Sequence, residues 1–414
     1  MADRARADHP DGLLTRMVPR TPAAALAICA LVALAACSAS RPAAGRASTS
    51  HASSTGGAQG PSTGQPVSVV RRLSVAQLAG QRVIYAYAGP VPPPSLLARI
   101  RLGQAAGVIF FADNIQSPTQ LARVIGTLQA ANVASPVHAP LLMLLDQEGG
   151  QVRRLPGPPV LSEKQVGRAP HAATIASQTG TDTARSLRAA GINVNLAPVL
   201  DVYRSPGDFI DRYDRSYSSR PSIVGTLATA FITAQQQGGV AATAKHFPGL
   251  GAAAAGQDTD ERPVTIPTAI DRLRATDEAP YRNAIAAGVK LVMTSWATYP
   301  ALDAHHPAGL SRTVIQSELR NRLGFKGITI TDSIGAGALT SIGTVGRRAL
   351  LAAQAGADLI LCSGNPSAGK NTPTTAIDAL HGLIDGLNQR TLDKTDAQHA
   401  VERIIDLRNS LPGR

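Results

Sequence analysis

Short runs of hydrophobic residues recur eight times along this chain, and helix-length segments separate them. Continuous apolar runs indicate strands that are buried on both faces, as the strands of parallel sheets are. Eight strand–helix units after about residue 68 fit a (β/α)8 barrel, the TIM type of α/β fold. The expected strands are Arg82–Tyr87, Gly107–Phe111, Pro140–Leu145, Asn193–Ala197, Val240–Lys245, Lys290–Thr294, Gly327–Thr331 and Ala357–Leu361.

A doubly wound open sheet is the alternative α/β architecture. Folds of that kind that bind dinucleotides carry a glycine-rich phosphate loop after the first strand. The segment after Arg82–Tyr87 has no such loop. We therefore predict a single barrel domain over residues 68–414.

The first 67 residues have a different character. Four arginines precede an apolar run from Ala23 to Ala36, which is too short to span a bilayer and suits the core of a signal peptide. The run ends in Leu34-Ala35-Ala36-Cys37, which resembles a bacterial lipobox. We expect a signal peptide at 1–36, lipidation of Cys37 and attachment to the extracytoplasmic face of the cell membrane. A soluble secreted protein with an incidental cysteine is the alternative.

Residues 37–67 are expected to form a tether. The stretch from Ser38 to Gln65 is rich in Ser, Ala, Gly, Thr and Pro and has no aliphatic side chain larger than Ala. Such a segment cannot bury a core and predicts a flexible linker. With Cys29 in the signal and Cys37 lipidated, Cys362 would remain alone, so we expect neither an intrachain disulfide nor a cysteine metal cluster.

The positive charge of the chain does not indicate nucleic-acid binding. The formal net charge is +12, but aromatic residues make up only 3% of the chain and no Lys/Arg run is interleaved with them. A nucleic-acid-binding domain needs its basic residues gathered with stacking groups or a known motif. We expect no nucleic-acid partner.

Polar and charged side chains follow the third to the seventh expected strand. Catalytic groups of an α/β barrel collect at the carboxyl ends of its strands. Any one of these residues alone is explained by helix capping or ion pairing, but together they favour a polar small-molecule site. They lie in Asp146–Arg154, in Pro198–Asp201 with Arg212–Tyr217, in Lys245–Gly251, in Thr294–Trp296 and at Asp332.

Several of these segments resemble motifs of glycoside hydrolase family 3. Leu319–Gly327, followed by Thr331-Asp332-Ser333, is similar to the family signature. Lys245-His246-Phe247-Pro248-Gly249 and Asp146-Gln147-Glu148-Gly149-Gly150 resemble the bacterial β-N-acetylglucosaminidases of that family. The segments Gly107–Phe111, His306–Ser311 and Ala355–Asp358 also fit.

This resemblance implies roles for individual residues. Asp332 would be the nucleophile that forms a covalent glycosyl-enzyme, because an oxocarbenium-like transition state needs an anion next to the anomeric carbon. Charged side chains around the sugar would bind its hydroxyls through charge-assisted hydrogen bonds. The residues at the matching positions are Asp146, Arg154, Arg215, Lys245 and His246.

The chain departs from the family where the proton donor is expected. The resemblance implies an Asp-Ser-His element after Lys-His-Phe-Pro-Gly, whose His is the acid/base catalyst. Here no His lies between His246 and His305. Asp258 falls at the position of the Asp, and Asp260 falls at the position of the His after a two-residue lengthening of the loop.

Three interpretations of this loop remain open. Asp260 or Glu261 replaces the His as general acid, which requires burial to raise the pKa of the carboxyl. Alternatively an external group such as phosphate assists, or hydrolysis is lost and the barrel binds glycan. We expect the first, in a monomeric hydrolase without metal or organic cofactor that removes terminal β-linked N-acetylglucosamine from cell-wall glycans. A β-glucosidase is the enzymatic alternative.

Overall fold

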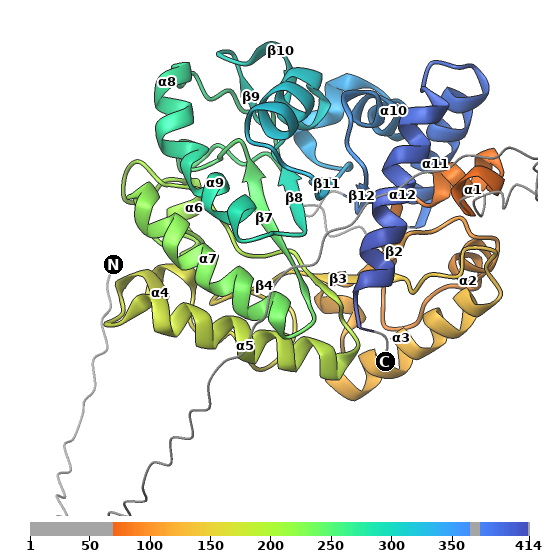
Figure 1. The fold of residues 1–414 in the computed structure, drawn as a ribbon, viewed down its shortest axis with the longest axis horizontal. Helices are drawn as coiled ribbons and strands as arrows, with labels where there is room; N and C mark the ends of the chain where they lie inside the picture. Colours follow the sequence, from red (N-terminus) through yellow and green to blue (C-terminus); the bar gives the residue numbers. More distant parts are fainter. Residues whose placement is uncertain (1–68, 365–372, 413–414) are drawn as a thin grey trace, which may run out of the picture. The chain divides into compact units, whose positions relative to one another are not determined.

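The computed structural model describes residues 69–364 and 373–412 (Figure 1). The predicted signal peptide, Cys37 and the tether at 37–67 lie outside these residues. In the part of the chain that is described, no helix combines the length and the apolar character needed to cross a membrane.

The eight expected strands form one parallel sheet. Its hydrogen-bonded order is β11-β8-β7-β6-β3-β2-β1-β12. A parallel bridge between Ile330 and Leu359 joins β11 to the residues that lead into β12, so the sheet closes on itself. The predicted (β/α)8 barrel is therefore confirmed. The strands are β1 (Val83–Tyr85), β2 (Gly107–Ile109), β3 (Leu142–Leu145), β6 (Val194–Asn195), β7 (Ala241–Phe247), β8 (Leu291–Thr294), β11 (Ile328–Thr331) and β12 (Ile360–Cys362).

Two short hairpins extend from the carboxyl ends of the barrel strands. β4 (Gln147–Gly149) pairs with β5 (Val152–Arg153) directly after β3. β9 (Thr298–Tyr299) pairs with β10 (Asp303–Pro307) after β8. The first hairpin brings a second acid, Glu148, toward the end of the barrel at which Asp146 lies.

Helices surround the barrel, and α5 packs on α7, α7 on α9, and α10 on α11 (Figure 1). The α-helices are α1 (Val75–Gly80), α2 (Pro94–Arg101), α3 (Pro118–Val133), α4 (Glu163–Arg168), α5 (Ala172–Ala190), α6 (Phe209–Arg212), α7 (Pro221–Gln237), α8 (Ile270–Arg272), α9 (Ala279–Ala286), α10 (Val345–Ala355), α11 (Pro373–Asn388) and α12 (Lys394–Ser410). Short 3₁₀ segments are η1 (Val69–Arg72), η2 (Ala112–Asn114), η4 (Ala308–Leu310) and η6 (Gly337–Ile342), and π-helical segments are η3 (Leu273–Asp277) and η5 (Thr313–Arg322).

Local sequence signals account for several helix ends. Ser74 caps α1 in a reciprocal capping box with Gln77, and Ser117 caps α3 ahead of Pro118. Gly191 ends α5 in the left-handed conformation, which glycine adopts without the cost that a Cβ brings.

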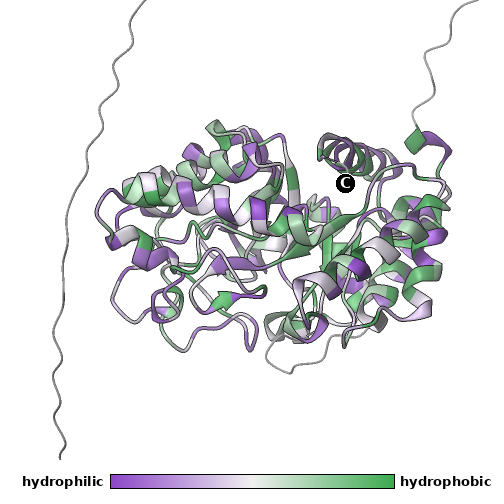
Figure 2. Ribbon diagram, turned by 90° about the horizontal axis from the view of Figure 1, so that it is seen from below, coloured by the Kyte–Doolittle hydropathy of each residue, from purple (hydrophilic) through white to green (hydrophobic). Residues whose placement is uncertain are grey.

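Alternate strand residues fill the barrel interior. Ile84, Ile109 and Leu144 belong to one buried cluster that takes side chains from every strand of the barrel. The residues of opposite parity pack outward against the helices, as expected when successive side chains of a strand point to opposite faces. In Figure 2 hydrophobic strand segments lie in the middle, and helices of mixed hydropathy surround them.

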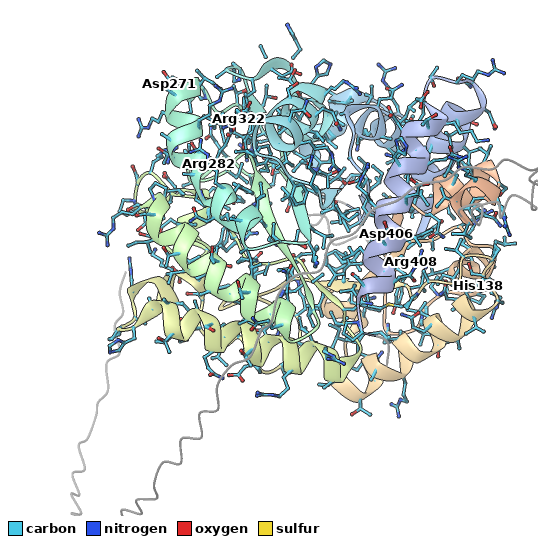
Figure 3. The ribbon with its side chains drawn as sticks, in the orientation of Figure 1. His138, Asp271, Arg282, Arg322, Asp406 and Arg408 are labelled. Atoms are coloured by element: carbon cyan, nitrogen blue, oxygen red, sulfur yellow. The ribbon has the colours of Figure 1, made fainter. Side chains whose placement is uncertain are left out.

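The last helix closes the end of the barrel away from the strand-end acids. Ile404 and Leu407 of α12 belong to the interior cluster. Beside them the guanidinium of Arg408 is almost fully buried (Figure 3), and it donates to the carbonyls of Pro140 (2.7 Å) and Ala139 (2.6 Å), which precede β3. Burial lowers the pKa of Arg408 to about 9. α12 therefore seals the amino-terminal ends of the strands and leaves the carboxyl ends open for chemistry.

Candidate active site

The charged residues that follow the strands line one cavity of about 150 Å³. It lies at the carboxyl ends of the barrel strands, the position at which barrel enzymes place their active sites. All eight residues predicted for the sugar site and for catalysis contribute to its wall: Asp146, Arg154, Arg215, Lys245, His246, Asp258, Asp260 and Asp332.

A chain of buried ion pairs forms one wall of the cavity. Lys245, in the last part of β7, contacts Asp146 (2.9 Å) and Glu148 (2.6 Å) through its ammonium group. Arg215 donates two parallel hydrogen bonds to Glu148, from Nε (2.8 Å) and from Nη2 (2.9 Å). Such bidentate geometry fixes the plane of the guanidinium as well as its position.

The ion pairs keep these groups charged despite their burial. Burial pushes the pKa of Glu148 upward, but the charges of Arg215 and Lys245 lower it to about 2. Burial likewise raises the pKa of Asp146, but Lys245 and Arg154 bring it below its ordinary value. For Lys245, burial lowers the pKa and the two carboxylates raise it above the ordinary value. The wall therefore presents fixed charges to a ligand at neutral pH.

His246 is oriented by a buried aspartate. Its Nδ1 lies 2.7 Å from Oδ2 of Asp201, which is fully buried. The other oxygen of Asp201 accepts the backbone N–H groups of His246 (3.2 Å) and Leu250 (2.6 Å). The second ring nitrogen of His246 lies 3.4 Å from Nη2 of Arg215 and borders the cavity. Asp201 therefore fixes the ring, and Nε2 is the nitrogen that a ligand can reach.

Arg154 is held more loosely. Its guanidinium lies 3.7 Å from Asp146, and its Nε has no hydrogen-bond partner among the described residues. A side-chain donor that is buried and unpaired costs free energy unless a ligand or water satisfies it. Arg154 is therefore suited to donate to a ligand hydroxyl.

Asp332 lies directly after β11, and its backbone is tied to neighbouring strands. Its N–H donates to the carbonyl of Thr294 (3.3 Å), and one of its carboxylate oxygens accepts the N–H of Ser333 (2.7 Å). The indole of Trp296 is buried behind this segment and donates to the carbonyl of Ser333 (2.7 Å). We expected Trp296 at the mouth of the site. That expectation is wrong, because the side chain supports the Asp332 segment from the core.

The loop after β7 brings a second carboxyl group to Asp332. Burial, followed by the charges of Asp332 and Asp258, raises the pKa of Asp260 to about 8. Burial also raises the pKa of Asp258, whose Oδ1 accepts the N–H of Asp260 (2.8 Å). The raised pKa favours the protonated form of Asp260 in the same cavity as Asp332, and this is the form that a general acid requires.

Glu261, the other candidate for the acid, points elsewhere. Its side chain is 49% exposed and pairs with Arg262 (3.1 Å). It does not line the cavity. Of the two acids that we considered, the geometry favours Asp260.

Two residues of the segments predicted for this site had no individual role assigned from the sequence. Glu148 lies two positions after Asp146 on β4, so both side chains reach the same side of the hairpin. That spacing is a signal that could have identified it. Asp201 could not be assigned from the sequence, because a strand-end aspartate is equally suited to a helix cap, and only the fold brings it to His246.

A larger cavity of about 480 Å³ lies elsewhere and lacks acidic groups. It is lined by residues of α3, of α5 and of the segments that precede β3, β6 and β7, so it opens at the amino-terminal ends of the strands. Its charged or titratable lining consists of His138, labelled in Figure 3, and Arg188. Without a carboxyl group it offers neither a nucleophile of the carboxylate type nor a general acid.

Comparison with known proteins agrees with this geometry. Residues 94–407 match the model of the glycosyl hydrolase family 3 N-terminal domain. An uncharacterized secreted glycosyl hydrolase of Arthroderma benhamiae is 45% identical over 82% of this chain and 94% of its own length. A β-hexosaminidase of Nitrosomonas eutropha is 34% identical over 72% of this chain and 86% of its own.

Solved structures show the same barrel. A family 3 β-N-acetylglucosaminidase from Paenibacillus sp. str. FPU-7 superposes with a TM-score of 0.76 at 34% identity, over 83% of this chain. The match spans only 64% of that longer chain. A β-N-acetylhexosaminidase from Beutenbergia cavernae superposes with a TM-score of 0.71 at 28% identity, over 81% of this chain and 98% of its own.

Proposed function

Because the chain belongs to glycosyl hydrolase family 3 and is a glycosidase, we propose that it removes terminal β-linked N-acetylglucosamine with retention of configuration. The observation that carries the proposal is that Asp332 lines one cavity with Asp260, whose pKa is raised by burial and by the neighbouring carboxylates, and with a wall of buried charges. The N-acetylglucosamine preference is supported by the β-hexosaminidase and β-N-acetylglucosaminidase relatives.

The first step forms a glycosyl ester. A carboxylate oxygen of Asp332 attacks the anomeric carbon, the glycosidic C–O bond breaks, and the proton of Asp260 passes to the departing oxygen. Arg154, Lys245 and His246 hold the sugar hydroxyls, which fixes the anomeric carbon against Asp332.

The second step returns the enzyme to its starting state. Ionised Asp260 takes a proton from water, whose oxygen attacks the anomeric carbon and releases Asp332. Two displacements at one carbon restore the original configuration. Because Asp260 supplies the proton that the resemblance to the β-N-acetylglucosaminidases assigns to a His, neither a phosphate co-substrate nor a loss of catalysis is needed to explain the missing His.

The test compares two substrates and one variant. Protein lacking residues 1–66 should hydrolyse 4-nitrophenyl N-acetyl-β-glucosaminide faster than 4-nitrophenyl β-glucoside, and Asp332→Ala should abolish turnover of both. A faster reaction with the glucoside would assign a β-glucosidase. Binding of N-acetylglucosamine oligosaccharides without turnover of either substrate would assign a glycan-binding protein.

We further propose that the barrel acts as a monomer on cell-wall glycans while tethered to the membrane through lipidated Cys37. The lipobox-like Leu34–Cys37 sequence and the low-complexity segment after it support this proposal. Wild-type protein should partition into a detergent phase and incorporate labelled fatty acid, and Cys37→Ser should do neither. Because one acyl chain anchors a protein only marginally, stable attachment requires two or three. Equal labelling of the variant would show that Cys37 is not the lipidated residue.

A further inference from the structure

The end of the acid-bearing loop is bonded to the segment that follows Asp332. The N–H of Gly337 donates to the carbonyl of Asp260 (2.8 Å), and the N–H of Ala338 donates to the carbonyl of Thr259 (3.1 Å). Gly337 and Ala338 are the first residues of η6. N–H groups in the first turn of a helix have no partner within the helix. In this barrel they bind the loop, and we call these two hydrogen bonds the latch.

The latch leaves no room for a side chain at Gly337. A Cβ at this position would lie 2.2 Å from the carbonyl oxygen of Glu261 and 2.5 Å from its carbonyl carbon. Both atoms belong to the backbone, so no side-chain rotation can relieve the overlap. The backbones of η6 and of the loop can approach this closely only because residue 337 is glycine.

The η6 side of the latch is anchored to the barrel. The N–H of Ile334 donates to the carbonyl of Leu361 in β12 (2.9 Å), and the N–H of Ala336 donates to the carbonyl of Ser333 (3.1 Å). Arg348 of α10 donates to the carbonyl of Ile334 (3.3 Å). Asp332 and the latch therefore belong to one stretch of backbone that is fixed at both ends.

Other contacts hold the loop before and after the acid. After Asp260, the N–H of Ile266 donates to the carbonyl of Thr298 (2.9 Å), and the N–H of Thr298 donates to the carbonyl of Val264 (2.9 Å). The N–H of Phe209 donates to the carbonyl of Ala253 (2.9 Å), and Arg212 donates to the carbonyl of Ala255 (2.8 Å). None of these contacts involves Thr259 or Asp260. The latch is the contact that ties the backbone of these two residues to the segment after Asp332.

We propose that Gly337 is a positioning residue, which fixes the acid Asp260 relative to the nucleophile Asp332 by holding the loop backbone against η6. This inference rests on the proposed function of the site. It adds an explanation of how the carboxyl groups of Asp260 and Asp332 keep their relative positions.

The test is Gly337→Ala, with Gly256→Ala as the matched control. Gly256 lies in the same loop, and a Cβ there would meet nothing within 4 Å. In Gly337→Ala the loop end must move away from Asp332. For an alkyl β-glycoside, which needs proton donation, kcat/KM should fall about 10²-fold. For a dinitrophenyl glycoside, whose leaving group needs no proton, the loss should stay below about fivefold. Gly256→Ala should match the wild type on both substrates.

The pH profile supplies a readout that a purely structural role would not move. Displacement of Asp260 from Asp332 and from its buried position lowers its pKa, so the alkaline limb of kcat/KM should shift to lower pH in Gly337→Ala. Equal losses on both glycosides with an unmoved limb would overturn the inference, as would an equal effect of Gly256→Ala. If the wild type hydrolyses neither glycoside, the proposed function fails instead.

Amide hydrogen exchange of the wild-type protein tests the latch without any variant. The N–H groups of Gly337 and Ala338 should exchange as slowly as those of the barrel strands, with and without a bound sugar. Fast exchange of both amides in the free protein would show that the loop opens, and it would overturn the inference even if Gly337→Ala did not fold.

Discussion

The proposed mechanism depends most on Asp260, because its carboxyl group would take the place of a histidine and needs a raised pKa to donate a proton. An isolated aspartic acid would be ionised at neutral pH and could not donate a proton. Burial and the charges of Asp332 and Asp258 supply the needed shift, to about 8. Burial contributes most to this shift, and the charges of the two neighbouring carboxylates add to it.

The leaving group should reveal whether Asp260 donates the proton. Asp260→Asn should reduce kcat/KM for alkyl glycosides by about 10²–10⁴-fold, and far less for aryl glycosides with acidic phenols, because general acid catalysis helps only where the departing oxygen needs a proton. Added azide should partly restore kcat of the variant, since this anion attacks the glycosyl-enzyme without base assistance. Glu261→Gln is the control and should behave as the wild type. A uniform loss across leaving groups would mean that the loop only positions the substrate.

The alkaline limb of the pH profile should report the same proton. Activity requires protonated Asp260, so kcat/KM should fall above about pH 8. Asp258→Asn removes one of the negative charges that raise this pKa, and its limb should therefore move to lower pH. Initial rates between pH 5 and 10 check both statements. A limb that moves to higher pH in Asp258→Asn would contradict the electrostatic account.

At the scale of elements, α12 is the piece that completes the barrel. Removal of the Arg408 guanidinium leaves Oε1 of Gln81, which is buried, and the carbonyl of Pro140, which is half-buried, without this donor, whereas the carbonyl of Ala139 keeps the amide of Asn132. We expect Arg408→Met to lower the free energy of unfolding by about 2–4 kcal/mol, since each unsatisfied buried group costs about 1–3 kcal/mol. KM should be unchanged, because α12 lies at the end of the barrel away from the site.

The matched control for this prediction is Asp406→Asn on the same helix. Asp406 is exposed, and Figure 3 labels it beside Arg408. A surface substitution of this kind should change stability by less than about 0.5 kcal/mol. Urea unfolding of both variants measures the difference. Equal stability of the two would show that the Arg408 hydrogen bonds do not hold α12 in place.

The secondary structure elements differ in how well the sequence predicts them. All eight barrel strands could be predicted, because burial on both faces leaves a continuous apolar run in the sequence. Six strands fall within the expected runs, whereas β7 continues to Phe247 and β12 continues to Cys362. The β4–β5 hairpin was not foreseen, since strands of two or three residues carry no periodicity. The role of α12 was not foreseen either, because an amphipathic pattern does not tell which partner covers the apolar face.

Some features of the site could also be predicted from the sequence, and others could not. Asp146, Lys245 and Asp332 could be predicted because they lie near or directly after the carboxyl ends of strands, and these ends meet at one edge of a parallel sheet. The charge state of Asp260 could not be predicted, because its pKa depends on the burial and proximity of groups more than seventy residues away, such as Asp332. The fold and the positions of these residues can be predicted from the sequence pattern. The pKa of a carboxyl group depends on the groups that surround it in three dimensions.

For the whole molecule, the raised pKa of Asp260 links activity to stability. The folded state keeps its proton up to about pH 8, whereas the unfolded chain loses it near the ordinary value of 3.8. The unfolded state therefore binds fewer protons between these values, and the stability of the wild type should fall as pH rises through this window. Asp260→Asn cannot ionise and should not show this loss.

Thermal unfolding should show this linkage as a pH-dependent difference. The melting temperature of Asp260→Asn should exceed that of the wild type at pH 8.5 by more than it does at pH 5. Asp182→Asn, at a partly exposed position on α5, is the control for a change of net charge. A difference that stays constant with pH would mean that Asp260 ionises in the folded protein as it does in water.

The proposed retaining mechanism requires that Asp332 becomes covalently bonded to the sugar. The most direct measurement is inactivation by a 2-fluoro glycosyl substrate with an activated leaving group, followed by proteolysis and peptide mass mapping. We predict a single glycosylated peptide, modified at Asp332, and protection by a competing N-acetylglucosamine analogue. Modification at Asp146, at Asp201 or at Asp260, or turnover of the inactivator without any covalent adduct, would contradict the proposed mechanism.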